Sequence, residues 1–251
     1  MIRGIYTAAA GLATATLRLG VVSNNVANSQ TPGYKADQLP AEVGKALDLL
    51  KLATDPNGNP IGTVTLGPRS GLSRLDLSQG SLQETGNQFD LALGGPGFFA
   101  VQANGGPVRY TRDGGFRVDS QGMLLARDGS GVLNTAGQPI QVPSGRVDVG
   151  ADGALLVNGV QIDQLQIVDF PAGQLVDKTG NGQLAPQNGA TPQPANPNTQ
   201  VYQGYLETSN VDVTDQTVAS MQLVRAYQAN QRVLTIQDET LQKTVNEVGK
   251  V

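Results

Sequence analysis

The chain has 251 residues, a formal net charge of −4, 39% hydrophobic residues and only 4% aromatic residues. It contains no cysteine and no histidine, which excludes disulfides, thiol nucleophiles, histidine acid–base catalysis and most zinc or copper sites. The acidic balance argues against general nucleic-acid binding, and the lack of a sustained apolar run of about 18 residues argues against direct membrane insertion.

The first predicted element is an amphipathic helix over residues 3–27. Its apolar and small residues alternate at spacings of three and four, which is the pattern of a coiled-coil seam. The seam consists of Ile2, Ile5, Ala9, Leu12, Thr16, Leu19, Ser23 and Val26. Threonines and Arg18 interrupt the apolar residues, so we do not expect a cleaved secretory signal.

Residues 23–35 predict the end of this helix and then a stiff, extended turn. They read Ser-Asn-Asn-Val-Ala-Asn-Ser-Gln-Thr-Pro-Gly-Tyr-Lys. Pro32 fixes its own φ and disfavours helix at Thr31, Gly33 tolerates a positive φ, and the asparagine side chains compete for backbone hydrogen bonds. On turn chemistry alone, an ordinary loop is the alternative interpretation.

Residues 37–80 predict a linker or extended segment. Residues 42–53 have a helical composition, which the sequence Asp-Pro-Asn-Gly-Asn-Pro at 55–60 ends. Residues 63–66 and 72–77 alternate in the manner of short strands.

Residues 81–204 predict an all-β domain of a sandwich-like or barrel-like kind. Short apolar runs recur about every ten residues, at 91–93, 98–101, 108–110, 116–118, 123–126, 132–133, 140–142, 147–149, 154–157 and 165–170. Asn-Gly, Asp-Gly and Gln-Gly pairs separate many of these runs and favour type I′ hairpin turns; they begin at residues 104, 113, 121, 128, 152 and 158. Residues 177–200 are poor in apolar side chains and predict a long exposed loop.

The last predicted element is a helix over residues 212–247. Asp212 or Thr214 can cap it, and Asp215 lies in the first turn, where the helix dipole favours a negative charge. One apolar stripe contains Leu223, Tyr227, Asn230, Leu234, Leu241, Val245 and Val248. A second stripe contains Val218, Met221, Val224 and Val233.

These elements predict an α+β fold in which the long N- and C-terminal helices pair like a coiled coil. Residues 1–36 carry three basic and no acidic side chains, whereas residues 205–251 carry six acidic and four basic ones, so the two ends are weakly complementary. We therefore expect residues 1–36 and 205–251 to form one helical core. The second stripe of the C-terminal helix needs a further partner, which other copies of the chain can supply.

No stretch predicts an enzyme, a cofactor site or a metal site. The glycine-rich residues 94–97 match neither a dinucleotide fingerprint nor a phosphate-binding loop, and the Asp-Gly pairs lack the spacing of a calcium loop. Glu84 and Asp90 are isolated carboxylates without the arrangement of an acid–base pair. The residues alone predict an elongated, non-enzymatic protein built to associate.

Five ordered blocks of sequence resemble the flagellar basal-body rod and hook family. Ala-Asn-Ser-Gln-Thr-Pro-Gly-Tyr-Lys at 27–35 is similar to the family's Ala-Asn-x-x-Thr-x-Gly-Phe/Tyr-Lys signature. Residues 79–99 and 110–122, which include Asp-Leu-Ala-Leu-Gly and Tyr-Thr-Arg-Asp-Gly-Gly-Phe, are similar to its β domain. Gln-Gly-Tyr-Leu-Glu-Thr-Ser-Asn-Val at 203–211 and Arg-Ala-Tyr-Gln-Ala-Asn at 225–230 are similar to its carboxy-terminal blocks.

The resemblance implies a structural subunit of the bacterial flagellum. It implies that the flagellar type III apparatus exports this subunit without a cleaved signal. It also implies helical polymerisation into the basal-body rod, the drive shaft that crosses the cell envelope and transmits torque from motor to hook. Copies of the chain and other rod and hook proteins are the implied partners, with the paired helices in the inner tube. A single β domain favours the distal rod; a proximal rod paralogue, a hook-type subunit and a calcium-dependent surface adhesin are the alternatives.

The resemblance and the helix seams together indicate the residues at assembly interfaces. They are Ile5, Leu12, Leu19, Asn24, Asn25, Asn28, Thr31, Pro32, Gly33, Tyr34, Gly204, Glu207, Ser209, Asn210, Val211, Arg225, Tyr227, Asn230, Leu234 and Leu241.

Overall fold

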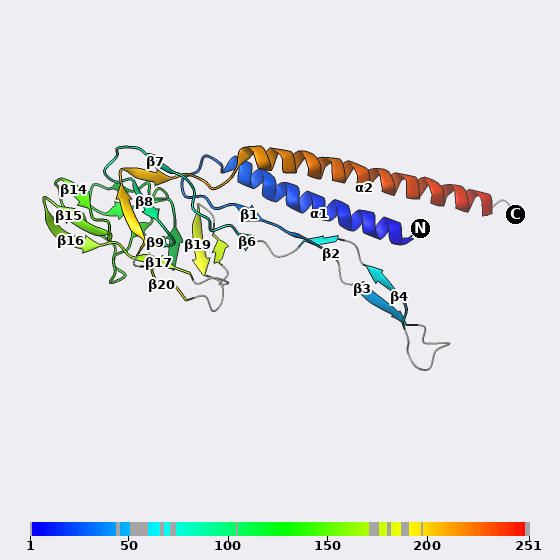
Figure 1. Ribbon diagram of the computed structural model, residues 1–251, viewed down its shortest axis with the longest axis horizontal. Coiled ribbons are helices and arrows are strands. Elements are labelled where there is room, and N and C mark those ends of the chain that lie inside the picture. The colour runs from blue at the N-terminus through cyan, green and yellow to red at the C-terminus, as the bar shows by residue number, and fades with distance from the viewer. Residues whose placement is uncertain are drawn as a thin grey trace. The chain divides into compact units, whose positions relative to one another are not determined.

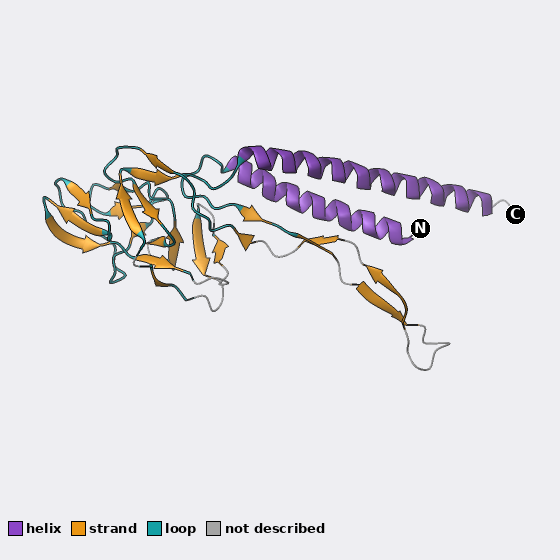
Figure 2. Cartoon of the chain, viewed as in Figure 1, coloured by secondary structure: helices purple, strands orange, loops and turns teal. Residues whose placement is uncertain are grey.

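The computed structural model describes residues 2–43, 46–50, 60–65, 68–70, 74–103, 105–170, 176–179, 182–186, 191–196 and 198–248. The chain divides into two compact units, which we name after their main content. The helical unit contains Met1–Val26, Asp37–Arg74 and Asp212–Val251, and the β unit contains Ala27–Ala36 and Leu75–Val211. Among the described residues, helices lie near the two ends of the chain and strands lie between them, which confirms the α+β class (Figure 2).

Two long helices dominate the helical unit. α1 (Ile2–Ala27) and α2 (Val213–Val248) confirm both helices expected from the sequence. α2 begins after Asp212, whose Oδ1 accepts the backbone N–H groups of Thr214 at 2.7 Å and Asp215 at 3.1 Å. Asp212 is therefore the N-cap, one of the two candidates that the sequence offered.

α1 and α2 lie side by side and run antiparallel (Figure 1). A Cβ atom built on Gly4 would lie 2.6 Å from Nε2 of Gln237, and one built on Gly11 would lie 2.8 Å from Nδ2 of Asn230. Glycine at these two positions lets side chains of α2 rest directly on the backbone of α1.

The buried face of α1 differs from the seam expected from the sequence. Ala8, Thr14, Ala15 and Asn25 are buried, whereas the expected seam residues Ala9, Thr16, Ser23 and Val26 are exposed. The prediction followed the larger apolar side chains, but the contact follows Gly4, Ala8, Gly11 and Ala15, one residue earlier. Small residues form the contact face because they permit the closest approach of the two helices.

α1 is long and apolar enough, by length and composition alone, to cross a membrane over Gly4–Ala27. The expectation that no such stretch exists is therefore wrong on that measure. Threonines and Arg18 do interrupt the apolar run, but the mean hydropathy of the helix stays high enough for a span.

Short strands complete the described part of the helical unit. β1 (Asp37–Gln38) leads into β2 (Ala41–Val43), which pairs antiparallel with β5 (Pro68–Ser70). β3 (Ala46–Leu50) pairs antiparallel with β4 (Pro60–Thr65). The helical interpretation of residues 42–53 is wrong for residues 42–43 and 46–50, because pairing between strands overrides weak local propensity. Residues 44–45 and 51–53 of that range lie outside the described residues. Residues 55–59 of the predicted break lie outside the described residues.

β9 (Phe98–Gln102) is the central strand of the β unit. One of its edges pairs with β10 (Val108–Thr111), and the sheet continues through β19 (Gln183–Pro186) to β18 (Val176–Lys178). The other edge pairs with β13 (Gly131–Val132) and with β17 (Ile167–Asp169). β12 (Leu124–Leu125) pairs with β13 on one side and with β11 (Arg117–Val118) on the other, and β20 (Gln193–Pro194) pairs with β17, so that β11, β18 and β20 are the outer strands.

Smaller antiparallel groups surround this sheet. One three-stranded group consists of β14 (Val147–Val149), β15 (Ala154–Val157) and β16 (Val160–Gln164). Two pairs join early and late segments of the unit: β7 (Leu82–Glu84) with β22 (Tyr205–Glu207), and β8 (Leu91–Gly94) with β21 (Gln200–Gln203). β6 (Arg74–Leu75) begins at the last residue of the helical unit.

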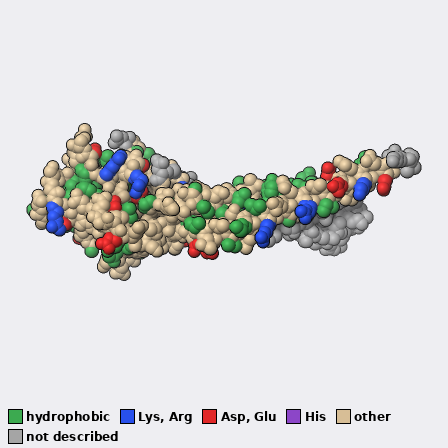
Figure 3. Space-filling view, turned by 90° about the horizontal axis from the view of Figure 1, so that it is seen from above, with side chains coloured by type: hydrophobic (Ala, Val, Ile, Leu, Met, Phe, Trp, Pro, Cys, Tyr) green, Lys and Arg blue, Asp and Glu red, His purple; other side chains and the backbone are tan. Residues whose placement is uncertain are grey.

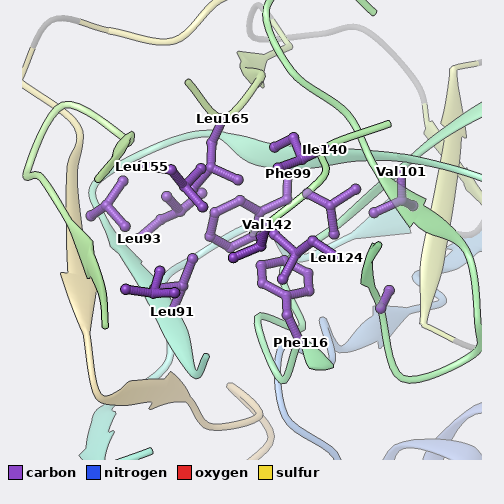
Figure 4. Packing of buried hydrophobic residues seen from close by; sticks show 14 of the residues in the cluster. Leu91, Leu93, Phe99, Val101, Phe116, Leu124, Ile140, Val142, Leu155 and Leu165 are labelled. Atoms are coloured by element: carbon purple, nitrogen blue, oxygen red, sulfur yellow. The ribbon is translucent and has the colours of Figure 1, made fainter. Parts of the chain in front are cut away.

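Both faces of β9 are buried, as its alternating side chains show. Phe99 and Val101 belong to the larger hydrophobic cluster, and Phe98 and Ala100 belong to a second one. Figure 4 shows the larger cluster, where Phe99 meets Phe116 edge to face with ring centroids 5.1 Å apart. A core this rich in β-branched and leucine side chains stabilises the unit despite the few aromatic residues.

The turns of the β unit match the predicted dipeptides in place but mostly not in type. Asn158 has a φ of 52° and Gly159 a φ of 83°, which confirms the type I′ turn between β15 and β16. Asn158 is the one non-glycine residue with positive φ in the described part of the chain, so the type I′ assignment is wrong for the other described pairs. At residue 113 the pair is no hairpin; Gly114 is needed because a Cβ there would strike the carbonyl oxygen of Leu91.

Two further expectations are corrected. Residues 177–200 do not form one exposed loop: β18, β19 and β20 lie within or across that range, and Leu184 is buried. Residues 140–142 do not form a strand, since only Gln141 makes an isolated bridge, to Met123, although Ile140 is fully buried. Leu184 reaches the core from strand β19, and Ile140 reaches it from irregular backbone.

Candidate assembly site

The loop that follows α1 is closed by a glycine in the left-handed region. Gly33 has a φ of 66°, as the sequence predicts, and its N–H donates to the backbone carbonyl of Glu207 at 2.8 Å. A Cβ at this position would lie 2.3 Å from the carbonyl carbon of Arg112. The loop therefore passes so close to two distant segments that only glycine fits.

A buried ion cluster lies beside this loop. Lys35 Nζ lies 2.6 Å from Oε1 of Glu207, and Arg112 Nη1 lies 2.8 Å from Oε2 of the same carboxylate. The Glu207 side chain is 0% exposed. One carboxylate thus holds two cations away from water, an arrangement that is stable only when the remaining donors and acceptors also find partners.

Backbone groups supply most of those partners. Lys35 Nζ donates to the carbonyl of Ser78 at 2.6 Å, and Glu207 Oε1 accepts the N–H of Gly80 at 2.9 Å. Arg112 donates to the carbonyls of Leu93 and Gly95. Within the described part of the chain, Arg112 Nε is buried without a hydrogen-bond partner.

Burial dominates the electrostatics of the cluster. It lowers the pKa of the Lys35 ammonium, against which the hydrogen bond and the charge of Glu207 act in the opposite direction. Burial likewise lowers the pKa of Arg112, again opposed by Glu207. The carboxylate of Glu207 therefore favours the charged state of both cations and opposes the effect of burial.

Asn210 joins the same segments through its side-chain amide. Its Oδ1 accepts the N–H of Ala36 at 2.8 Å, and its Nδ2 donates to the carbonyls of Asp76 at 2.8 Å and Ser78 at 3.1 Å. The N–H of Asp76 also donates to the carbonyl of Ala36 at 2.9 Å. Residues 27–36, 76–80 and 207–211 are thereby fastened together within the β unit.

A second asparagine, Asn25, links separate segments of the helical unit through its side-chain amide. Asn25 is buried near the end of α1 and forms both hydrogen bonds to the backbone of Asp37, accepting at 2.9 Å and donating at 2.8 Å. It also donates to Oε1 of Gln216 on α2 at 3.3 Å. Asn25 therefore fixes where the end of α1, the start of α2 and β1 meet.

Comparison with known proteins covers the same parts of the chain. The family model described as "Flagella basal body rod protein" matches residues 5–35, "Flagellar hook protein FlgE/F/G D1 domain" matches residues 92–167, and "Flagellar basal body rod FlgEFG protein C-terminal" matches residues 202–247. The flagellar basal-body rod protein FlgG of Buchnera aphidicola subsp. Schizaphis graminum is 31% identical over 263 residues, which cover 97% of this chain and 98% of the relative. The chain belongs to the flagellar basal-body rod protein family.

Other relatives carry two different names within this family. The rod protein FlgF of Caulobacter vibrioides is 30% identical over 253 residues, which cover both chains completely. The rod protein FlgG of Bacillus subtilis is 31% identical over 268 residues, which cover 98% of this chain and 99% of the relative. The family is a structural one, in agreement with the expectation that the chain is not an enzyme.

The predicted interface residues of this rod-family chain fall into three groups. The first group lies in or just before the signature loop, which is the loop at residues 27–35. Asn28, Thr31 and Pro32 are half-buried there, Tyr34 is buried, and Asn24, near the end of α1, is exposed. The amide oxygen of Asn28 accepts a hydrogen bond from the Thr31 hydroxyl at 3.3 Å.

The second group lies on either side of Glu207 in the sequence. Gly204, with a φ of 80°, accepts the N–H of Thr85 through its carbonyl at 2.7 Å. Ser209 Oγ accepts the N–H of Val211 at 3.2 Å. Gly204 directly precedes β22, which ends at Glu207, and Ser209 lies in the segment after it, which carries Asn210.

The third group lies on the helices. Tyr227, Asn230, Leu234 and Leu241 are half-buried, and Leu223 of the same stripe is buried. On α1, Ile5, Leu12 and Leu19 are half-buried, while Arg225 of α2 is exposed. The second stripe of α2 is exposed throughout.

Sequence reasoning missed several residues that complete these sites. Lys35 and Arg112 lie in the quoted family blocks, but nothing in the sequence marks them as partners of Glu207. Gly4, Gly11 and Gln237 were missed because a seam search follows apolar side chains. The one available signal was the excess of basic residues at the N-terminal end and of acidic residues at the C-terminal end.

Several carboxylates described outside the Glu207 cluster serve local structure. In the part of the chain that the structure describes, no group of three or more carboxylates gathers as a metal site would require. Asp90 accepts hydrogen bonds from the Thr85 hydroxyl at 2.7 Å and from the Asn87 amide at 3.1 Å, so its carboxylate stabilises the local turn. Asp119, Asp128 and Asp152 likewise accept backbone N–H groups of their own turns.

Proposed function

We propose that the chain is a subunit of the distal part of the flagellar rod, where it polymerises helically and transmits torque from motor to hook. The observation that carries this proposal is the fastening of the N-terminal signature loop to the C-terminal block through Glu207 and Asn210. Both blocks belong to family models that match this chain. A drive shaft needs many contacts that do not slip, and a buried, directional network provides them.

The two helices form an antiparallel, coiled-coil-like pair in this proposal. Three contacts support one register: Gly4 faces Gln237, Gly11 faces Asn230, and Asn25 binds Gln216. From one pair to the next, the residue number increases on α1 and decreases on α2 by the same amount, as expected for antiparallel helices in one register. The two glycine–amide contacts and the Asn25–Gln216 amide pair lie at intervals of seven and fourteen residues on both helices, which is the heptad spacing of a coiled coil.

The exposed apolar side chains of α2 form the contacts between copies. Met221 is 57% exposed and Ile236 55% exposed, and Val218 and Val233 lie on the same helix with similar exposure. Figure 3 shows hydrophobic side chains at the surface along the helices. A head-to-tail contact that does not close into a ring produces an open helical filament, and that filament covers these side chains.

Several finer points accompany the proposal. α1 packs in the rod and does not insert into a membrane, and the flagellar type III apparatus exports the subunit from the cytoplasm without a cleaved signal. The rod lies in the periplasm, and neighbouring rod and hook proteins are its partners. The β unit is sandwich-like, an inference supported by the burial of both faces of β9.

A proximal rod position is the second candidate, because relatives named FlgF match this chain as well as relatives named FlgG do. The calcium-dependent adhesin loses support, because the aspartates of the turns already accept backbone N–H groups. Non-enzymatic assembly explains the chain without a cofactor.

Complementation tests the proposal. The full-length chain is expressed in a strain that lacks either its distal or its proximal rod protein, and hook–basal bodies are counted by electron microscopy. We expect restored rods in the strain lacking the distal protein, and none with a chain that lacks residues 1–36. Restoration in the other strain establishes the proximal position; failure in both, or equal behaviour of the truncated chain, refutes a rod function.

A further inference from the structure

The chain passes between its two units at four points, after residues 26, 36, 74 and 211. Inside the β unit, three segments lead to these points: residues 27–36, the start of the segment at 75–80, and the end of the segment at 207–211. We propose, on the basis of the proposed rod function, that Lys35, Arg112, Glu207 and Asn210 form a clamp that locks these three segments together and carries torsional load.

Glu207 provides the charged half of the clamp. Its carboxylate receives Lys35 from the first segment at 2.6 Å and the N–H of Gly80 from the second at 2.9 Å, while its own backbone carbonyl receives the N–H of Gly33. Arg112 ties the same carboxylate to the sheet of the β unit, since it follows β10 directly and stacks over Phe98 with 5.3 Å between its guanidinium carbon and the ring centre. The carboxylate therefore joins both linking segments to the rigid sheet.

Asn210 provides the neutral half. One amide holds Ala36, the last residue before the first segment leaves the unit, and also holds Asp76, the second residue after the next segment enters. Asn210 itself precedes the last crossing point by two residues. One side chain thus reaches all three segments close to where the chain enters or leaves the unit.

The chemistry of the clamp suits a mechanical role better than a role in stability alone. A buried ion pair gains little net stability over a well-packed apolar replacement, because desolvation of the charges offsets their attraction. What it provides is direction: each hydrogen bond fixes one distance, so the segments cannot slide past one another as apolar surfaces can. Truncating one partner leaves the other charges buried and uncompensated, so the network holds or fails as a unit.

Hydrogen exchange on the purified full-length chain tests the clamp without requiring assembly. In Glu207→Gln and Asn210→Ala we expect exchange of the amides of Gly33, Ala36, Asp76 and Gly80 to accelerate by about tenfold or more, while amides of β9 and β10 keep their rates. Asp148→Asn is the matched control, because it removes an exposed ion pair with Arg146 in the same unit and should change none of these rates.

Motility under load tests the mechanical part. Strains with Asn210→Ala should assemble as many hook–basal bodies as the parent but swim more slowly in a medium of raised viscosity, whereas Asp148→Asn should match the parent. The clamp is overturned if exchange at the four amides is unchanged in both variants, if β9 exchanges equally fast, or if loaded swimming is normal. Should Glu207→Gln not fold, the exchange rates of Asn210→Ala decide between these outcomes. If the parental chain itself builds no rod, the rod function fails while the exchange result still decides whether the segments are locked.

Discussion

Glu207 and Lys35 are 172 positions apart in the sequence, yet Oε1 and Nζ lie 2.6 Å apart in the interior of the β unit. Each belongs to a block that resembles the rod family, one near each end of the chain. Their contact explains why both blocks occur together, since the signature loop after α1 needs the strand exit before α2 to close. The two ends of the protein are thus connected through the β unit as well as through their helices.

Gly33→Ala should destabilise the β unit by about 3 kcal/mol, since it combines backbone strain with a clash against the carbonyl group of Arg112. Gly86→Ala is the control: Gly86 also has a positive φ, 71°, but nothing lies within 4 Å of a Cβ built there, so strain alone costs about 1 kcal/mol. Urea unfolding gives both values. Equal losses would mean that the close approach to Arg112 is absent.

Lys35→Met should remove a pH dependence of the free energy of unfolding at alkaline pH. Because burial lowers the pKa of Lys35 below its ordinary value of 10.5, the unfolded chain binds more protons than the folded one between the two values. The free energy of unfolding of the parent therefore rises with pH through that window, relative to the variant. Urea unfolding of both proteins at a series of pH values up to 10.5 measures the difference. The raised pKa of Tyr110 affects both proteins alike and cancels. A difference that stays flat or falls would contradict the lowered pKa of Lys35, because it would mean that pairing with Glu207 offsets or outweighs the effect of burial.

Gly20→Ala and Gly11→Ala form a matched pair on α1. Nothing lies within 4 Å of a Cβ on Gly20, so alanine there should stabilise the helix by about 0.8 kcal/mol. At Gly11 the same change meets the amide of Asn230, so the gain should vanish or turn into a loss. Chemical unfolding followed by circular dichroism compares the two. A Gly11→Ala protein as stable as Gly20→Ala would show that the helices do not pack in this register.

Met221→Gln and Ile236→Gln should abolish assembly without harming the monomer. Both side chains are exposed, so the free energy of unfolding should change by no more than about 0.5 kcal/mol. Thr235→Gln, also on the exposed part of α2, is the control and should assemble normally. Sedimentation and electron microscopy of concentrated protein provide the measurement. Polymers formed by both Met221→Gln and Ile236→Gln would place the contact between copies elsewhere.

The sequence by itself determined the features that depend on neighbouring residues. The end of the first helix at Ala27, Asp212 as one of two possible caps, the tolerance of Gly33 for a positive φ and the Asn158–Gly159 turn follow from local backbone preferences. So do several strands of the β unit, such as β9, β10 and β15. The blocks that resemble the rod family also indicated its identity, because they can be compared letter by letter.

Only the tertiary structure decided which distant groups meet. The contact face of α1 follows Gly4 and Gly11 because side chains of α2 press on them, which no periodicity of apolar residues shows. Residues 46–50 form a strand because β4 pairs with them. Arg112 became a partner of Glu207 because β10 ends beside the exit of β22. Charge pairing carries no directional signature in sequence, so a buried ion cluster is visible only once the chain has brought its members together.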